Sequence, residues 1–295
     1  MLDACAEHPA VRQTLQEASD VLHQNIALLI AQGPAEQLNL TTNTQPVMLT
    51  AGIALWRLWL AEGGAMPQAM AGHSLGEYTA LVAAGSLAFA DALPLVRFRA
   101  QVMQEAVPVG SGAMAAILGL DDAVVREVCS DATSQSGSVV EAVNFNAPGQ
   151  VVIAGTKEAV DLACTRLKSR GAKRALPLAV SAPFHSTLLK PAAKRLAAYL
   201  EQVPVHGPVV PIVHNVDVAQ HPESQAIRQA LAAQASGAVR WVECVRALAL
   251  AGCTDIVECG PGKVLAGLTR RIDANLVSHA LTDASSAHSI QEVLA

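Results

Sequence analysis

The chain has 295 residues, of which 52% are apolar, and its net charge of −5 comes from intermixed acidic and basic residues. This composition allows a large core and excludes the basic stripe of a nucleic-acid-binding protein. The longest apolar stretch, residues 47–60, contains Arg57 and is too short to span a bilayer. Without a signal peptide, and with six cysteines that lack zinc-ligand spacing, we expect a cytoplasmic protein with reduced thiols and no metal.

The residues up to about 110 predict helices around one short strand. Apolar residues recur at helical spacing over residues 10–32, and Gly33-Pro34 ends that helix. The remaining predicted elements are a helix over about 44–62, a strand over 68–71, and helices over 75–84 and 89–107. The strand is therefore expected to pass into the helix at residue 75 through a sharp turn.

Residues 111–180 follow a different pattern, which predicts a small inserted domain. Strands are expected over 114–118, 139–144, 151–154 and 173–180, helices over 121–131 and 157–170, and a turn at 146–149. This β-α-β-β-α-β order is typical of a ferredoxin-like domain. Because it begins just after a helix and interrupts the preceding pattern, we interpret it as an insertion.

The alternation of helices and short strands resumes after residue 180. The predicted elements are helices over 187–202, 222–233, 239–250 and up to 272, and strands over 211–215 and 256–258. We therefore expect residues 1–110 and 181–295 to form an α/β core with one open, mostly parallel sheet and flanking helices. Residues 111–180 would be the ferredoxin-like subdomain inserted into that core.

Residues 72–76 read Gly-His-Ser-Leu-Gly, the Gly-x-Ser-x-Gly pattern of a nucleophile elbow. Such a turn exposes the Ser74 hydroxyl and directs the Leu75 N–H towards negative charge that develops beside it. We expect side chains at positions 72 and 76 to collide with the neighbouring strand and helix. The alternative is a turn with a helix-capping serine, and the strand-turn-helix context favours the nucleophile.

A serine nucleophile needs a base, and a substrate needs a binding group. His185 is the preferred base because it follows a predicted strand end, where ligands of open α/β sheets collect. A solvated loop histidine is the alternative, and His214 is a second candidate. Arg99 lies on the apolar face of its helix, where its charge needs a partner. It could form a structural salt bridge, or bury its aliphatic part while the guanidinium reaches solvent. It could also bind a substrate carboxylate with two hydrogen bonds.

Together these motifs resemble the malonyl-CoA:acyl carrier protein transacylases, the malonyl-loading enzymes of fatty acid synthesis. The matching segments are 72–78, Arg99, 144–155, 182–185, 215–217, Gln234 ahead of 239–241, and 260–265. They occur in the family's order over nearly the whole chain. The resemblance implies an α/β-hydrolase-like acyltransferase core with an inserted ferredoxin-like domain.

The resemblance also implies a ping-pong acyl transfer. Ser74 would attack the malonyl thioester, and His185 would act as base and then as acid. The group that orients His185 falls at the backbone carbonyl of Gln234, while the Leu75 N–H belongs to the oxyanion hole and Arg99 binds the malonyl carboxylate. The other implied substrate-binding residues are His73, Asn144 and Phe184, of which Phe184 resembles the malonyl-selective form of related polyketide acyltransferases.

The resemblance names an acyl carrier protein as the partner, in fatty acid or polyketide synthesis. Malonyl-CoA would be a substrate and the partner would carry the phosphopantetheine thiol, so no cofactor is implied, and we expect a monomer. An acidic carrier protein needs a basic landing surface. The candidates, each of which could instead be a solvated charge, are Arg270, Arg271, Lys190, Lys194 and Arg195.

One departure concerns the start of the chain. The family normally begins with an apolar strand and a Gly-Gln-Gly-Ser-Gln loop whose glutamine N–H supplies half of the oxyanion hole, whereas this chain starts at Met1-Leu2-Asp3. We favour a truncated sequence over an impaired, carrier-protein-binding paralogue because the other motifs are in place. A serine hydrolase or thioesterase is a further alternative. Arg99 argues against it, since a hydrolase of neutral esters does not need a buried guanidinium in its acyl pocket.

Overall fold

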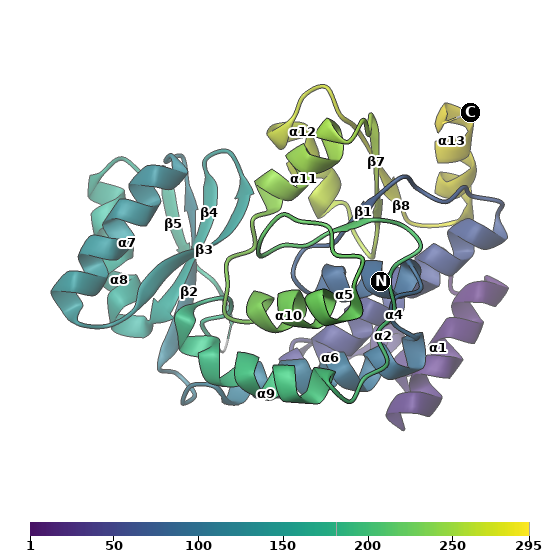
Figure 1. Cartoon of the computed structure of the whole chain (residues 1–295), viewed down its shortest axis with the longest axis horizontal. Coiled ribbons are helices and arrows are strands. Elements are labelled where there is room, and N and C mark those ends of the chain that lie inside the picture. Colours follow the sequence, from purple (N-terminus) through teal and green to yellow (C-terminus); the bar gives the residue numbers. More distant parts are fainter. Residues whose placement is uncertain (181, 295) are drawn as a thin grey trace.

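The computed structural model describes residues 1–180 and 182–294, and it shows a larger, mostly helical part beside a smaller part built on one sheet (Figure 1). The predicted fold class, α/β, is confirmed. The four-stranded sheet begins at Gly112 and ends at Pro177, and the division into domains at residues 110 and 180 stays a prediction. Residues 181 and 295, which bound the last predicted core segment, lie outside the described residues.

The first helices enclose the elbow on one side. They are α1 (Pro9–Leu22), α2 (Ile26–Gln32), α3 (Ala35–Leu38) and α4 (Thr41–Ala61). The prediction of one helix over 10–32 is wrong. The chain leaves helical geometry at His23, whose φ is 50°, and the Asn25 side chain caps α2 by accepting a hydrogen bond from the Leu28 N–H at 2.8 Å. Asn is a preferred N-cap, so Asn25 was the available signal for this break.

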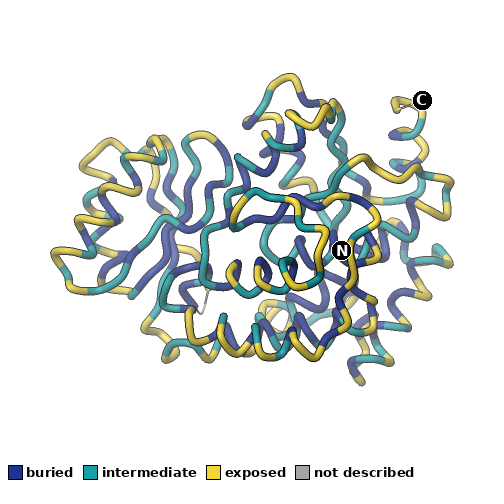
Figure 2. The backbone as a smooth tube through the Cα atoms, in the orientation of Figure 1, coloured by how far each residue is buried: buried dark blue, intermediate teal, exposed yellow. Residues whose placement is uncertain are grey.

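The helices and strand around the elbow have bounds close to the predicted ones. They are β1 (Met70–Ala71), α5 (Leu75–Ala83) and α6 (Phe89–Glu105). Helix α4 is buried along most of its length and packs against α1, α5 and α6, so β1 and α5 rest on a helical layer. Figure 2 shows buried backbone, in dark blue, through the interior of the larger part, to which the buried residues of α4 belong.

The smaller part has the predicted β-α-β-β-α-β order. Its elements are β2 (Gly112–Leu118), α7 (Asp122–Ser136), β3 (Val140–Ala147), β4 (Gln150–Thr156), α8 (Lys157–Ser169) and β5 (Arg174–Pro177). The antiparallel sheet has the strand order β3-β4-β2-β5. Strand β3 continues through Ala147, which confines the turn predicted at 146–149 to Pro148 and Gly149 and keeps Asn146 in the strand. We call this part the ferredoxin-like subdomain.

The two faces of the subdomain sheet have different neighbours. One face packs on α7 and α8, which lie on the outer side in Figure 1, through a cluster that includes Ile117 and Ile153. The opposite face contributes Met114 and Val152 to a small cluster with Phe184, which belongs to the larger part. The subdomain therefore contacts the core just before His185.

The rest of the chain completes the larger part. Its elements are η1 (Thr187–Leu189), α9 (Lys190–Leu200), β6 (Ile212–Val213), α10 (Ser224–Gln234), α11 (Trp241–Leu250), β7 (Asp255–Cys259), α12 (Val264–Ile272), β8 (Val277–Leu281) and α13 (Ala284–Leu294). The sequence did not predict β8 or α13. No helix among the described residues combines the length and apolar character needed to cross a membrane.

The strands of the larger part pair in parallel, as predicted, but not in one sheet. Within the described residues β1 pairs with β6, and β7 pairs with β8, as two separate two-stranded units. The pairing of β1 and β6 covers only two residues of each strand, so few inter-strand hydrogen bonds stabilise β1 next to the elbow. Helix α4 lies beside β7, where the Cys259 thiol donates to the Gly52 carbonyl at 3.4 Å.

Candidate active site

Ser74 joins β1 to α5 in a backbone conformation that non-glycine residues rarely adopt. Its φ is 52° and its ψ is −106°, and the side chain is partly exposed. Leu75 is the first residue of α5, so its N–H has no acceptor within the helix and lies at the positive end of the helix dipole. The structure thus has the strand-turn-helix geometry expected of a nucleophile elbow.

The two glycines of the elbow differ in their surroundings. A Cβ added at Gly72 would lie 2.0 Å from the carbonyl carbon and oxygen of Gly76, a distance that atoms cannot adopt. The prediction of a collision is therefore correct for Gly72. It is wrong for Gly76, where nothing lies within 4 Å of an added Cβ because position 76 faces open space.

His185 reaches the elbow from the loop before η1. Its Nε2 lies 2.7 Å from Ser74 Oγ, and its Nδ1 lies 2.8 Å from the backbone carbonyl of Gln234. A carbonyl only accepts, so Nδ1 carries the proton and Nε2 is left to accept from the serine hydroxyl. Burial, with the Arg99 charge adding to it, lowers the pKa of His185 to about 3, so its imidazole is neutral at pH 7.

Arg99 is 2% exposed and faces the same serine from α6. Its guanidinium donates to Ser74 Oγ at 3.1 Å, to Gln234 Oε1 at 2.9 Å and to Gln45 Oε1 at 2.7 Å. The Tyr78 ring lies 5.3 Å from its central carbon. Within the described chain no carboxylate pairs with Arg99 and its buried Nε has no hydrogen-bond partner. A salt bridge, left open by the sequence, is therefore not how this charge is held.

A buried polar network supports the turn from behind. Asn215 Oδ1 accepts from the Ser74 N–H at 2.7 Å, and Asn215 Nδ2 donates to the Gly72 carbonyl at 2.8 Å. Glu77, which is fully buried, accepts from the Asn215 N–H at 2.9 Å. Sequence reasoning did not assign Glu77 or Gln45 to the site. The signal for Glu77 was a carboxylate in the first turn of an otherwise apolar helix.

The second candidate base, His214, is not at the serine. Its Nδ1 lies 2.8 Å from Glu77 Oε1, and both side chains are fully buried. The prediction that His214 could serve Ser74 is therefore wrong, because its one paired nitrogen is committed to Glu77 and its Nε2 has no partner among the described residues.

The three other predicted substrate-binding residues, Phe184, His73 and Asn144, have different surroundings. Phe184 packs between α6 and the subdomain sheet, immediately before His185. His73 Nε2 lies 2.8 Å from Asn146 Oδ1, and its ring meets Trp241 edge-on at 5.6 Å. Asn144 instead pairs through its backbone with Val239, and its buried Oδ1 has no partner among the described residues. Asn146 therefore makes the contact with the elbow, and Asn144 does not.

The five basic candidates divide by whether their charge is already engaged. Arg195 pairs with Glu105 at 2.8 Å, and Arg270 donates to the Ser278 hydroxyl at 3.0 Å. Arg271, although exposed, bonds to the Pro148 carbonyl. The other two, Lys190 and Lys194, are exposed on α9.

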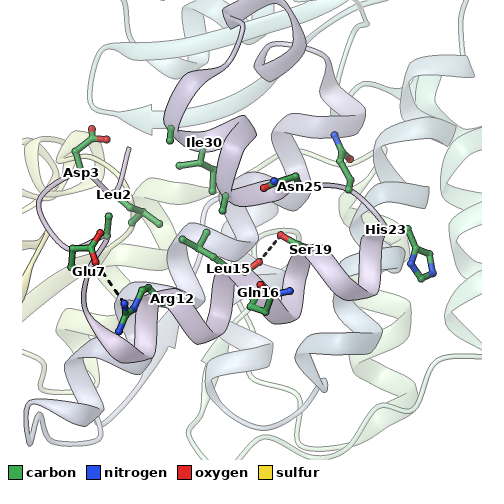
Figure 3. A pocket seen from close by; sticks show the side chains of 14 residues that line it. Leu2, Asp3, Glu7, Arg12, Leu15, Gln16, Ser19, His23, Asn25 and Ile30 are labelled. Atoms are coloured by element: carbon green, nitrogen blue, oxygen red, sulfur yellow. Dashed lines mark hydrogen bonds and ion pairs between the residues drawn. The ribbon is translucent and has the colours of Figure 1, made fainter.

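A separate hollow in the described chain does not belong to this site. It has a volume of about 610 Å³ and lies between the N-terminal segment and helices α1 and α2, where Leu2, Arg12 and Ile30 are among its lining residues (Figure 3). All of its lining residues fall between positions 2 and 31, so none is a candidate site residue. The chemistry is therefore carried by the elbow and not by this hollow.

Known proteins resemble this chain over nearly its whole length. Residues 3–277 match the acyl transferase domain family. The chain is 52% identical to the malonyl CoA-acyl carrier protein transacylase of Escherichia coli K12, over 97% of this chain and 92% of that protein. It is 44% identical to the protein of that name from Bacillus subtilis, over 93% and 86%.

Two solved structures extend the comparison. An acyl-carrier-protein S-malonyltransferase from Burkholderia pseudomallei 1710b has 62% identity and a TM-score of 0.97, over 99% of this chain and 94% of that one. A malonyl-transacylase solved with a type II PKS acyl-carrier protein has 49% identity and a TM-score of 0.97, with the same coverage. The chain therefore belongs to the acyl transferase domain family and, within it, to the malonyl-CoA:acyl carrier protein transacylases.

Proposed function

We propose that this chain moves a malonyl group from malonyl-CoA to the phosphopantetheine thiol of an acyl carrier protein through a malonyl-serine at Ser74. One observation carries the proposal: Ser74 Oγ lies 2.7 Å from the neutral base His185 and 3.1 Å from the guanidinium of Arg99. A nucleophile, a base and a buried cation without a carboxylate partner thus converge on one atom. That combination suits an acyl group that carries a free carboxylate.

In the first half-reaction His185 Nε2 takes the proton of Ser74 as Oγ attacks the malonyl thioester carbonyl. The Leu75 N–H at the start of α5 faces the oxyanion that forms. The intermediate collapses to the malonyl-serine ester, and the CoA thiolate leaves with the proton that His185 held. The Gln234 carbonyl keeps the imidazole in the required tautomer and stabilises its transient charge.

The second half-reaction reverses these roles. The phosphopantetheine thiol gives its proton to His185 and attacks the malonyl-serine carbonyl, after which the proton returns to Ser74 Oγ. Arg99 holds the malonyl carboxylate in both halves, through the donor that now contacts Ser74 Oγ and through its Nε, which has no partner among the described residues. The neutral hydroxyl is a weaker partner for a guanidinium than a carboxylate, so the substrate can replace it while the bond to Gln234 Oε1 remains.

The partner in this proposal is an acidic acyl carrier protein. A related malonyl-transacylase has been solved with such a protein, which supports the assignment. Of the predicted landing residues, Lys190 and Lys194 on α9 are the strongest candidates because they are exposed and Arg195 and Arg270 are engaged. The cysteines of the described chain are free thiols, which supports a reducing, cytoplasmic setting. We retain the expectation of a monomer, which sedimentation would check.

Mass spectrometry of the chain mixed with malonyl-CoA tests the intermediate. We expect one malonyl adduct on the peptide that contains Ser74 and none in Ser74→Ala. An adduct of equal yield in Ser74→Ala would place the acyl group elsewhere and contradict the proposal.

Replacing Arg99 tests the carboxylate role. Arg99→Ala should reduce kcat/KM for malonyl-CoA by at least about 100-fold more than for acetyl-CoA, because two charge-assisted hydrogen bonds worth about 1.5–3 kcal/mol each are lost only with malonyl. Equal losses for the two substrates would show that Arg99 does not bind the carboxylate.

A further inference from the structure

Glu77 is a buried carboxylate to which the proposed mechanism gives no task. It lies in the first turn of α5, three residues after Ser74, and is fully buried. Its oxygens accept from His214 Nδ1 at 2.8 Å, the Asn215 N–H at 2.9 Å and Gln234 Nε2 at 2.9 Å. A buried anion is costly unless its oxygens are bonded, and all three partners here are donors. The site therefore holds this carboxyl group at a defined place.

The bond to Gln234 determines which way the side-chain amide points. Gln234 Nε2 donates to two oxygens that can only accept, Glu77 Oε2 at 2.9 Å and the Ser74 carbonyl at 2.9 Å. The amide oxygen must then face the other way, and it accepts from Arg99 at 2.9 Å. A reversed amide would place oxygen against oxygen on one side and N–H groups against a guanidinium on the other.

Gln234 also serves the base, because its backbone carbonyl accepts from His185 Nδ1 at 2.8 Å. One residue thus holds the guanidinium through its side chain and the imidazole through its main chain. Gln234 is fully buried, so water does not substitute for these bonds. A change in its side chain would move Arg99 while leaving the type of acceptor at His185 unchanged.

We infer that Glu77 is a positioning residue for malonyl recognition, which acts through the Gln234 amide to aim the Arg99 guanidinium at the acyl pocket. The inference rests on the proposed function, since it concerns how the carboxylate-binding arginine is held. Glu77 makes no hydrogen bond to Ser74 Oγ, His185 or Arg99 within the described structure. Its effect on the reaction is therefore indirect and falls on substrate choice more than on the serine's reactivity.

The test compares Glu77→Ala with Gln234→Met, which removes the amide but keeps the backbone carbonyl for His185. The measured quantity is the ratio of kcat/KM for malonyl-CoA to that for acetyl-CoA, in which the fraction of active enzyme cancels. Each variant should lower this ratio about tenfold, and the double variant should lower it no further, because both changes break the same link. If Glu77→Ala does not fold, Glu77→Asp takes its place, because the shorter side chain cannot keep the 2.9 Å contact with Gln234 Nε2.

Glu77→Gln should restore the ratio to within about threefold of the wild type. Its amide oxygen can face the Asn215 N–H and Gln234 Nε2, while its NH₂ donates to His214 Nδ1 once that ring carries its proton on Nε2, which now has no partner. The matched control is Glu258→Ala, which removes a carboxylate that caps α12 by accepting from the Ala266 N–H at 2.8 Å and lies on β7, a strand that pairs with β8 and not with the elbow strand β1. It should leave the ratio unchanged.

An unchanged ratio in Gln234→Met, or a ratio in Glu77→Gln as low as in Glu77→Ala, would overturn the inference. Failure of the proposed function would look different. It would appear in the wild-type protein as a lack of malonyl adduct at Ser74, or in Arg99→Ala as equal losses for the two substrates.

Discussion

Ser74 and His185 meet at 2.7 Å, yet different parts of the molecule hold them there. Ser74 is placed by the chain next to it, because β1, the tight turn at Gly72 and α5 leave its side chain one direction to point. His185 has a φ of 65° in a loop, and its ring is oriented by a carbonyl 49 residues further along the chain. The direction of Ser74 depends first on local backbone geometry, which the distant Asn215 supports, whereas the place of His185 depends on packing between distant segments.

The ferredoxin-like subdomain takes part in that packing. Glu141 of β3 accepts from the Thr187 N–H at 2.7 Å and from the Thr187 hydroxyl at 3.1 Å, and so holds the start of η1 two residues after His185. The same strand bonds to Val239, in the segment between α10 and α11, and reaches His73 through Asn146. The comparison teaches that one strand of the subdomain contacts both sides of the site, at Thr187 just after His185 and at His73 within the elbow.

The substitution with the largest expected effect disrupts the elbow turn. Gly72→Ala should lower the free energy of unfolding by about 3 kcal/mol or more, at or beyond the upper end for an overpacked site, because its Cβ meets the α5 backbone. The matched control is Gly76→Ala, which faces open space and should raise stability by about 0.5–1 kcal/mol through the better helix propensity of alanine. Urea denaturation measures both. Equal stabilities for the two variants would disprove the close approach at Gly72.

A smaller effect should follow from loosening the base. Glu141→Ala should slow malonylation of Ser74 about tenfold, because the charge-assisted bonds at Thr187 contribute about 1.5–3 kcal/mol and only part of this is expressed in the position of His185. Glu127→Ala is the control, since it removes an exposed glutamate paired with Arg170 on the same subdomain. Rapid-quench measurement of the adduct gives the rates. If both variants react alike, the subdomain does not position the base.

The smallest expected effect is a rate that hardly changes with pH. Because burial lowers the pKa of His185 to about 3, the base stays neutral, and sulfonylation of Ser74 by uncharged phenylmethanesulfonyl fluoride should change less than about twofold between pH 8 and 5. A histidine with the ordinary value of 6.5 would slow about 30-fold over that range. Such a loss would show that the imidazole is not desolvated as described.

The lowered pKa of His185 also makes the stability of the fold depend on pH. Below pH 6.5 the unfolded chain takes up a proton at His185 that the folded chain refuses, so this residue lowers stability as the pH falls from 6.5 towards 3. Above pH 6.5 it has no effect, because the histidine is neutral in both states. Replacing His185 should therefore reduce the acid sensitivity of the fold.

Much of the molecule could be predicted from local pattern. The Gly-x-Ser-x-Gly elbow, the subdomain order over residues 112–177 and most helix bounds depend on neighbours within a few positions, so periodicity and turn residues indicate them. Where a local signal was overlooked, as with Asn25, one helix was predicted in place of two. The pairing of the core strands as β1–β6 and β7–β8 is a contact between distant segments, and periodicity carries no information about it.

The sequence by itself indicated the elbow serine, its turn and the residue types of the proposed malonyl-binding site. Only the tertiary structure decided that Asn146 and not Asn144 reaches His73, that Gln45 and Gln234 hold Arg99, and that His214 serves Glu77. The physical reason is that a buried polar group must find a hydrogen-bond partner, and that partner comes from whichever segment packing brings within about 3 Å.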